Sequence, residues 1–179
     1  MTASTGDGGY EVESPASFGS VIAVGGTSLV RDGSPRGWTE TAWSGAGSGC
    51  STLNNKPVWQ TTATACGKKA TADVSAVADP HTGVAVYDSY AYQGASGWMV
   101  FGGTSASSPI VASVYALGTT ASGRGGSGNP VAHTWATPGG LNDVTSGTNG
   151  TCATAVWCTS GAGWDGPTGL GTPNGLSAF

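Results

Sequence analysis

The feature that most constrains the fold of this chain is the run Met99–Val111, which reads MVFGGTSASSPIV. The apolar segment Gly97–Phe101 ends in a glycine pair, and this predicts a short strand followed by a tight turn. The next residues favour a helix over Pro109–Leu117, because a proline has no N–H to lose in a first turn and Ser107 or Ser108 can cap it. The run therefore predicts a strand, a glycine turn and a helix in close succession.

The residues of this arrangement leave two interpretations open. The free N–H groups and the positive dipole end at the start of a helix would stabilise an oxyanion, which suits a serine nucleophile in the turn. On its own, a Gly-Thr-Ser turn is more often a capped helix start with no catalytic role.

Composition limits the classes of protein to which the chain can belong. Its 179 residues suffice for one domain with a hydrophobic core. Thirty-two glycines and a charged fraction of 9% indicate many turns, while 38% apolar residues and seven tryptophans argue against disorder. The net charge is −4 and the six Lys and Arg residues are scattered, so no nucleic-acid partner is predicted. No apolar run approaches the roughly 20 residues of a membrane span.

Elsewhere the chain has only short signals of regular structure. Val21–Val24 is predicted to be a buried strand closed by a turn at the glycine pair that follows. Gly83–Asp88 is predicted to be a strand that pairs with the one before the glycine-serine turn. Residues 32–69 are predicted to be mostly loop, and residues 118–140 a surface excursion rich in Gly, Ser and Pro. No domain boundary is evident.

The four cysteines form two local pairs, Cys50 with Cys66 and Cys152 with Cys158. Neither pair has the Cys-x-x-Cys spacing of a zinc site, so the alternatives are two short-loop disulfides or four buried thiols. Disulfides in a chain rich in Gly, Ser and Thr favour an exported protein. The first residues contain no signal-peptide pattern, so export predicts that residue 1 is not the natural start.

The glycine-serine turn also carries a resemblance to known enzymes. Gly103–Pro109, which reads GTSASSP, resembles the nucleophile motif shared by subtilisins and by the sedolisin family of serine-carboxyl peptidases. In that motif the serine directly after Gly-Thr is the nucleophile, which implies Ser105 here. A Ser-His-Asp triad does not fit, because His81 stands only 24 residues before Ser105 in a turn-like segment and His133 follows it. Both histidines are predicted to be ordinary surface residues.

Further segments resemble sedolisins in the same order along the chain. They are Ser4–Gly9, Ser14–Ser17 with Val21–Thr27, Trp43–Gly45 and Ala72–Pro80. The chain thus resembles the carboxyl-terminal part of a sedolisin catalytic domain, closest to bacterial secreted members. The resemblance implies an α/β fold, a subtilisin-like parallel sheet flanked by helices, with the amino-terminal half of the domain absent. It also implies that Asp7, in the family's Ser-Gly-Asp motif, is protonated at low pH and donates a hydrogen bond to the oxyanion.

The same resemblance implies a calcium site in the carboxyl-terminal region, at about residues 140–175. Sedolisins bind this ion with two aspartates and main-chain carbonyls. The matching positions are Asp143, Val144, Gly161, Gly163 and Asp165. Hard oxygen ligands on a glycine-rich backbone are what calcium prefers. From spacing alone, the two aspartates would instead be turn residues that accept local N–H groups.

One part of the sedolisin site has no match in this chain. The family's base is a glutamate oriented by an aspartate, and no Glu-x-x-x-Asp pair occurs here. Glu11 lies close to Asp7 but in a turn and in reversed order, so it is not assigned as the base. Three hypotheses follow. The chain is the carboxyl-terminal part of a longer product, a processed subunit whose glutamate lies on another chain, or a non-catalytic descendant.

Under the first two hypotheses, the complete protein is a secreted, acid-active peptidase that acts on peptides or proteins. Residues 1–179 are then a single, partial peptidase domain whose partner is the amino-terminal segment of the same domain. Under the third hypothesis, the chain is an inactive domain that binds peptides or assembles with a partner.

Overall fold

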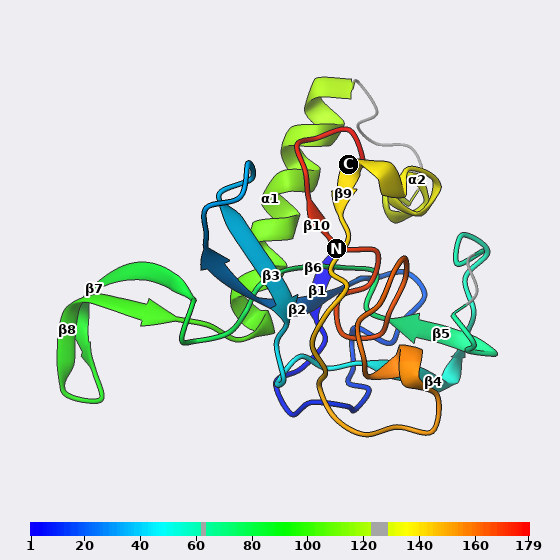
Figure 1. The fold of residues 1–179 in the computed structure, drawn as a ribbon, viewed down its shortest axis with the longest axis horizontal. Coiled ribbons are helices and arrows are strands. Elements are labelled where there is room, and N and C mark those ends of the chain that lie inside the picture. The colour runs from blue at the N-terminus through cyan, green and yellow to red at the C-terminus, as the bar shows by residue number, and fades with distance from the viewer. Residues whose placement is uncertain (62–63, 123–128) are drawn as a thin grey trace.

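The centre of the fold is a four-stranded sheet in which three strands run parallel (Figure 1). The computed structural model describes residues 1–61, 64–122 and 129–179. The parallel strands are β1 (Thr2–Ser4), β2 (Ile22–Arg31) and β6 (Val74–Val77), and the antiparallel strand is β3 (Trp38–Ala42). β2 is central, because it pairs with each of the others. Parallel strands with a helix packed on them define an α/β fold, as predicted.

The long helix α1 (Thr104–Ser122) packs on the three parallel strands. Its buried residues recur every three or four positions, as expected for a helix with one face on a sheet. Among the described side chains of α1, they are Thr104, Ser107, Val111, Tyr115 and Gly118. The helix begins five residues earlier than predicted, and Pro109 lies inside it. The prediction that Ser107 or Ser108 caps the helix is therefore wrong, because the cap comes from a distant part of the chain.

β2 is longer than predicted, because its glycine pair continues the strand and does not form a turn. A Cβ atom at Gly25 would lie 2.2 Å from the carbonyl oxygen of Pro167. A Cβ atom at Gly26 would lie 2.5 Å from the Cβ atom of Ala78. Successive strand residues face opposite sides of a sheet. Neighbouring segments thus approach both sides of β2, and only glycine leaves room for them.

The segment 32–69, predicted to be mostly loop, contains strands. β3 lies within it, and β4 (Gly49–Asn55) pairs antiparallel with β5 (Lys68–Thr71). Their side chains are largely polar and do not alternate, so the two-residue period that reveals a strand is missing. The predicted disulfide Cys50–Cys66 is present and joins β4 to the chain just before β5.

β7 (Val84–Tyr92) and β8 (Ala95–Phe101) form the predicted antiparallel hairpin. The hairpin projects from the body of the molecule and leads directly into α1 (Figure 1). Several of its large side chains are exposed, among them Tyr87, Tyr90, Trp98 and Val100. The hairpin therefore presents apolar surface beside the start of α1.

The carboxyl-terminal part has little regular structure. It contains α2 (Val131–Ala136), the 3-10 turns Pro138–Gly140 and Ala155–Trp157, and the paired strands β9 (Leu141–Asn142) and β10 (Thr172–Pro173). The predicted surface excursion at 118–140 instead includes the end of α1 and all of α2, while residues 123–128 lie outside the described residues. The chain returns to α1 at its end, where the rings of Phe179 and Tyr115 meet edge to face at 4.8 Å.

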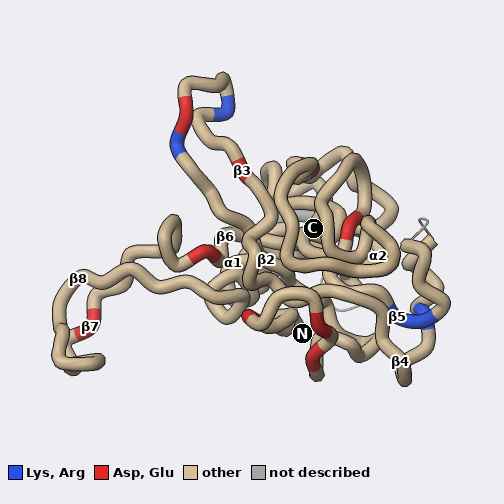
Figure 2. The backbone as a smooth tube through the Cα atoms, turned by 60° about the horizontal axis from the view of Figure 1, so that its bottom comes forward, with Lys and Arg blue, Asp and Glu red and all other residues tan. Residues whose placement is uncertain are grey.

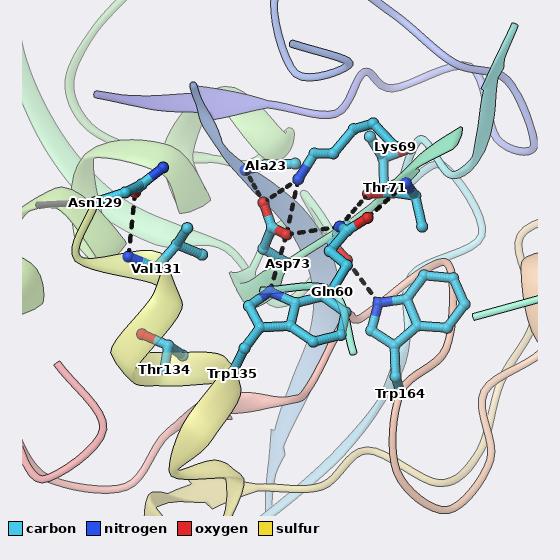
Figure 3. A network of polar contacts seen from close by, with 12 residues as sticks. Ala23, Gln60, Lys69, Thr71, Asp73, Asn129, Val131, Thr134, Trp135 and Trp164 are labelled. Carbon is cyan, nitrogen blue, oxygen red and sulfur yellow. Dashed lines mark hydrogen bonds and ion pairs between the residues drawn. The ribbon is translucent and has the colours of Figure 1, made fainter. Parts of the chain in front are cut away.

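A buried ion pair lies at the start of β6 (Figure 3). The side chains of Lys69 and Asp73 are fully buried, and Nζ lies 2.6 Å from Oδ2 and 2.8 Å from Oδ1. The same carboxylate accepts hydrogen bonds from Gln60 Nε2, the Trp135 ring N–H and the Ala23 main-chain N–H. A buried charge is tolerated only when it is satisfied in this way. The network fixes the beginning of the strand against which α1 packs.

Charged side chains are sparse along the chain, at 9% of the residues. Figure 2 shows the basic residues of the described segments at two separate places, the tip of the β2–β3 hairpin and the region of β5. On the β2–β3 hairpin, the Arg31 guanidinium stacks over the Trp38 ring at 4.8 Å. Within the part of the chain that the structure describes, no helix is long and apolar enough to cross a membrane.

Candidate active site

Ser105 lies in the first turn of α1, just after the glycine pair that follows β8. A Cβ atom at Gly102 would lie 2.3 Å from the carbonyl oxygen of Ala78, and Gly103 has a φ of +89°. The pair therefore allows a close approach to the end of β6 and a sharp change of direction. The result is an exposed serine at the amino end of a helix, where free N–H groups gather.

Of the three serines in this segment, only Ser105 is free to react. The Ser107 hydroxyl is buried and donates to the carbonyl oxygens of Ala76 (3.0 Å) and Val77 (2.9 Å). The Ser108 hydroxyl is bonded to the Thr2 hydroxyl at 3.1 Å. Both anchor α1 to the sheet. The Ser105 hydroxyl forms no hydrogen bond with any described residue, which leaves it available to a substrate.

Thr104 connects Asp7 to Ser105, because it directly precedes Ser105 in the chain and is hydrogen-bonded to the Asp7 carboxyl group. Oδ1 of Asp7 accepts the Thr104 main-chain N–H at 2.7 Å and lies 2.9 Å from its hydroxyl. The buried Thr104 hydroxyl also accepts the N–H of Gly6 at 3.2 Å. Asp7 thus caps α1, although 97 residues separate it from the helix. Oδ2 lies on the other side, 2.7 Å from where a Cβ atom at Gly103 would stand.

The role of Thr104 was missed in the sequence. The motif contains Gly-Thr-Ser, but nothing in the sequence indicates that this hydroxyl meets a loop near residue 7. The contact depends on the pairing of β1 with β2 and on the packing of α1 against both.

A groove opens beside Ser105, between the exposed side of α1 and the base of the β7–β8 hairpin. Its lining is mostly apolar and includes Val84, Val86, Phe101, Pro109 and Ile110 together with Ser105 itself. The nucleophile candidate therefore faces an open, largely apolar surface.

No proton acceptor is bonded to Ser105 among the described residues. The exposed His81 ring lies 2.9 Å from Asp79, and His133 is bonded to the Ser177 carbonyl oxygen at 3.0 Å. The Glu11 carboxylate is folded onto Gly8 of its own loop. The site thus places Ser105 directly after the residue that Asp7 bonds, Thr104, and leaving Glu11 unassigned stays a prediction.

The structure brings four of the five predicted metal-site residues to one turn. Asp143 Oδ2 accepts the N–H of Gly163 at 2.8 Å, and Asp165 Oδ2 accepts the N–H of Gly161 at 3.2 Å. The fifth, Val144, follows Asp143 and has a buried side chain, so only its main-chain oxygen is suited to a ligand role. The second predicted disulfide, Cys152–Cys158, closes a short loop in the chain between the two aspartates.

The donors around this turn fit a hard cation. Asp165 is fully buried, and burial raises its pKa to about 7, although hydrogen bonds from Thr168, Gly161 and Ser160 act in the opposite direction. No basic side chain is bonded to this carboxylate among the described residues. Among the described residues, no three His, Cys, Asp or Glu side chains come together in a way that could hold a metal ion. Two carboxylates and main-chain oxygens are therefore the available ligands, a set typical of calcium.

Comparison with known proteins identifies the family of this chain. A family model described as the subtilase family matches residues 1–137. The chain belongs to the subtilase family. Over 178 residues it is 33% identical to sedolisin from Pseudomonas sp. (strain 101), and over 185 residues 34% identical to kumamolisin from Bacillus sp. (strain MN-32). These alignments cover 91% and 95% of this chain but only 29% and 32% of the relatives.

Solved structures of other proteases show the same fold. Pseudomonas sedolisin, a serine-carboxyl proteinase complexed with pseudo-iodotyrostatin, matches with a TM-score of 0.80 at 31% identity. The match covers 97% of this chain and 52% of that one. The S41 psychrophilic protease, at 20% identity and a TM-score of 0.62, shares the fold alone. The resemblance to sedolisins and the subtilisin-like fold are thus confirmed, and the chain spans about half of the solved sedolisin.

Proposed function

We propose that this chain supplies the nucleophile and the oxyanion-binding part of a serine-carboxyl peptidase site. The observation that carries the proposal is the Asp7 carboxyl group, bonded to the N–H of Thr104 directly before the exposed Ser105. Membership of the subtilase family and similarity to sedolisin support proteolysis as the reaction class. Peptides or proteins are then the substrates.

In this reaction, Ser105 Oγ would attack the carbonyl carbon of the scissile peptide bond and release its proton to a carboxylate base. The carbonyl oxygen would become an oxyanion, stabilised by the Ser105 N–H and by a protonated Asp7. Because Oδ1 of Asp7 accepts from Thr104, Oδ2 is the oxygen left to carry the proton. A carboxyl group donates only when it is protonated, so the mechanism requires acid.

The base comes from outside the described residues in this proposal. The groove beside Ser105 is open and largely apolar, and the chain spans about half of the solved sedolisin. A further segment would pack its apolar side on Val84, Phe101 and Ile110 and direct a glutamate carboxylate to Ser105. This segment would be an earlier part of the same product or a separate chain.

The lack of an acceptor at Ser105 among the described residues favours a second candidate function. The chain would then be a catalytically inactive domain that holds a peptide in the groove or assembles with a partner. Removing the base from such a site leaves at most weak catalysis. The two functions differ in whether a segment that carries the base produces turnover.

A calcium ion is part of the proposal, held by the carboxylates of Asp143 and Asp165 and by the carbonyls of Val144, Gly161 and Gly163. The ion would neutralise the buried Asp165 carboxylate and join the segments on which these residues lie. Isothermal titration calorimetry tests the site directly. We expect calcium binding to the unmodified chain and at least a tenfold weaker affinity in Asp165→Asn, roughly the effect of losing one charged ligand. Equal affinity in the two proteins would refute the assignment.

We also propose that the protein is secreted and that residues 1–179 form one partial domain. The two disulfides support secretion, because such bonds persist in oxidising compartments.

A peptide aldehyde tests the nucleophile without requiring the base. Ser105 Oγ would add to the aldehyde carbon while the hydroxyl proton passes to the aldehyde oxygen, and carbon-13 NMR would detect the hemiacetal. We expect this signal in the unmodified chain, a weaker one in Asp7→Ala and none in Ser105→Ala. A hemiacetal that persists in Ser105→Ala would refute the assignment.

A further inference from the structure

Asn149 is a buried side chain that the proposed mechanism does not use. It is 4% exposed, and its Nδ2 donates to the Ala46 carbonyl oxygen and to the Ser48 hydroxyl at 2.8 Å. Its Oδ1 has no hydrogen-bond partner among the described residues. A buried acceptor without a partner costs free energy. We therefore attribute the presence of asparagine at this position to the two hydrogen bonds that its Nδ2 donates. The sequence Asn-Gly-Thr is formally a glycosylation sequon, but an Nδ2 atom buried in two hydrogen bonds is not available to a glycan.

The main chain of Asn149 contacts the loop that carries Asp7. Its carbonyl oxygen accepts the N–H of Tyr10 at 3.0 Å, and its own N–H donates to the Cys158 carbonyl oxygen at 3.0 Å. A Cβ atom at Gly9 would lie 2.7 Å from the carbonyl oxygen of Asn149. The loop 6–10 therefore ends directly against this residue.

The side chain of Asn149 holds the turn on which the same loop rests. Gly47 donates its N–H to the Gly6 carbonyl oxygen at 2.9 Å, and Gly9 donates its N–H to Gly45 at 3.0 Å. The turn 45–48 is thus bonded near both ends of the loop. Because Nδ2 of Asn149 is bonded to two residues of that turn, one asparagine joins the loop and its support.

We infer that Asn149 is a positioning residue for Asp7. Asp7 is exposed and its carboxyl group is bonded to Thr104, so its place depends on the path of the loop. Without the side chain of Asn149, the loop and the turn lose their common anchor, and the carboxyl group moves away from the Thr104 N–H. The inference rests on the proposed function only for the catalytic role of Asp7.

The amide hydrogen of Thr104 reports the position of Asp7 directly. Thr104 is the first residue of α1, so its N–H has no acceptor within the helix and is protected by Asp7. Hydrogen exchange followed by NMR on the whole chain measures this protection. Asn149→Leu has a similar volume but no donors, and should speed exchange at Thr104 at least about tenfold relative to Val111 in the same helix.

Asn54→Leu is the matched control, because the Asn54 side chain also donates to serine hydroxyls, but those of Ser17 and Ser51, which belong to neither the loop 6–10 nor the turn 45–48. It should leave the ratio of the Thr104 and Val111 exchange rates unchanged. If Asn149→Leu does not fold, Ser48→Ala removes one of the two acceptors and should raise the ratio in the same direction. An unchanged ratio in every folded variant of Asn149 and Ser48 overturns the inference.

Catalysis gives a second readout, in a protein that contains the base. Asn149→Leu should lower kcat about tenfold and change KM by less than about twofold, because a misplaced oxyanion donor weakens binding of the transition state. Failure of the proposed function is distinguishable from failure of the inference about Asn149. It appears as no Ser105-dependent turnover in the unmodified protein, while the exchange measurement still decides the role of Asn149.

Discussion

At the scale of single residues, one carboxyl group serves both the helix and the proposed chemistry. Oδ1 of Asp7 caps α1 by accepting the Thr104 N–H, while Oδ2 faces Gly103. A negative or polar group at this end of a helix is favoured by the helix dipole. The cap therefore fixes the side chain in the place where an oxyanion donor is needed.

Gly103→Ala should disrupt this arrangement. The new Cβ atom would stand 2.7 Å from Asp7 Oδ2, and alanine would be strained at a φ of +89°. We expect aldehyde affinity to fall at least about tenfold and unfolding free energy by about 1–2 kcal/mol. Gly94→Ala is the matched control, because its φ is +82° and nothing lies within 4 Å of its Cβ position. Equal aldehyde affinities in the two variants would contradict the placement of Oδ2.

Substitutions of Asp7 should separate its two roles. Asp7→Asn keeps an oxygen that can accept the Thr104 N–H, whereas Asp7→Ala does not. The unfolding free energy, measured with urea and tryptophan fluorescence, should fall by about 1 kcal/mol in Asp7→Ala and by clearly less in Asp7→Asn. The same loss in both variants would mean that Asp7 does not cap the helix.

At the scale of elements, a carboxylate ties the turn between β6 and β7 to β2. Asp79 accepts the Ser28 hydroxyl at 2.6 Å and the His81 N–H at 2.9 Å, and lies 2.9 Å from the His81 ring Nδ1. Burial raises the pKa of Asp79, but these donors more than offset it and hold the pKa below its ordinary value. The folded chain thus binds this proton less tightly than the unfolded chain. The stabilisation is present above the ordinary carboxyl pKa and is lost as the pH falls.

The loss of unfolding free energy caused by Asp79→Asn should therefore depend on pH. Unfolding free energy should fall by about 1 kcal/mol at about pH 6, and by progressively less as the pH falls below the ordinary carboxyl pKa and the group takes up its proton. Urea unfolding of both proteins across this range measures the difference. A difference that stays constant with pH would show that the carboxylate charge has no part in it.

The buried ion pair at the start of β6 should be the most sensitive polar contact in the fold. Lys69→Met leaves the buried Asp73 carboxylate without its counter-charge, and should lower unfolding free energy by about 3–5 kcal/mol. Lys68→Met is the control, because among the described residues that side chain bonds the Leu53 carbonyl oxygen near the surface, and its loss should cost less than about 1 kcal/mol. Urea unfolding of the two variants should separate them clearly, and similar losses would contradict this role of the pair.

Elements with a strong local pattern were predictable. The β7–β8 hairpin and the helix after the glycine-serine turn follow from apolar runs bounded by glycine and proline. The start of α1 was not predictable, because its cap is Asp7 and not Ser107 or Ser108. The continuation of β2 through Gly25 and Gly26 was also missed, since glycine pairs normally mark turns and here serve close packing.

At the scale of the whole molecule, the order of short motifs predicted the family and the fold, because motifs keep their order even where strands are hard to recognise. The contacts that complete the site could not be read in this way. Thr104 and Asn149 act through partners more than 90 residues away, and only the assembled fold brings them together. That the proton acceptor for Ser105 lies outside this chain stays a prediction.

The most direct test of the account is the rate of peptide hydrolysis at about pH 4, where a carboxyl donor and a carboxylate base can coexist. The rate is measured for the chain alone and for the chain joined to an amino-terminal segment that carries a Glu/Asp pair, each beside its Ser105→Ala variant. The account predicts turnover by the joined protein only, and its loss in Ser105→Ala. Equal turnover by the chain alone, or turnover that survives Ser105→Ala, would contradict it.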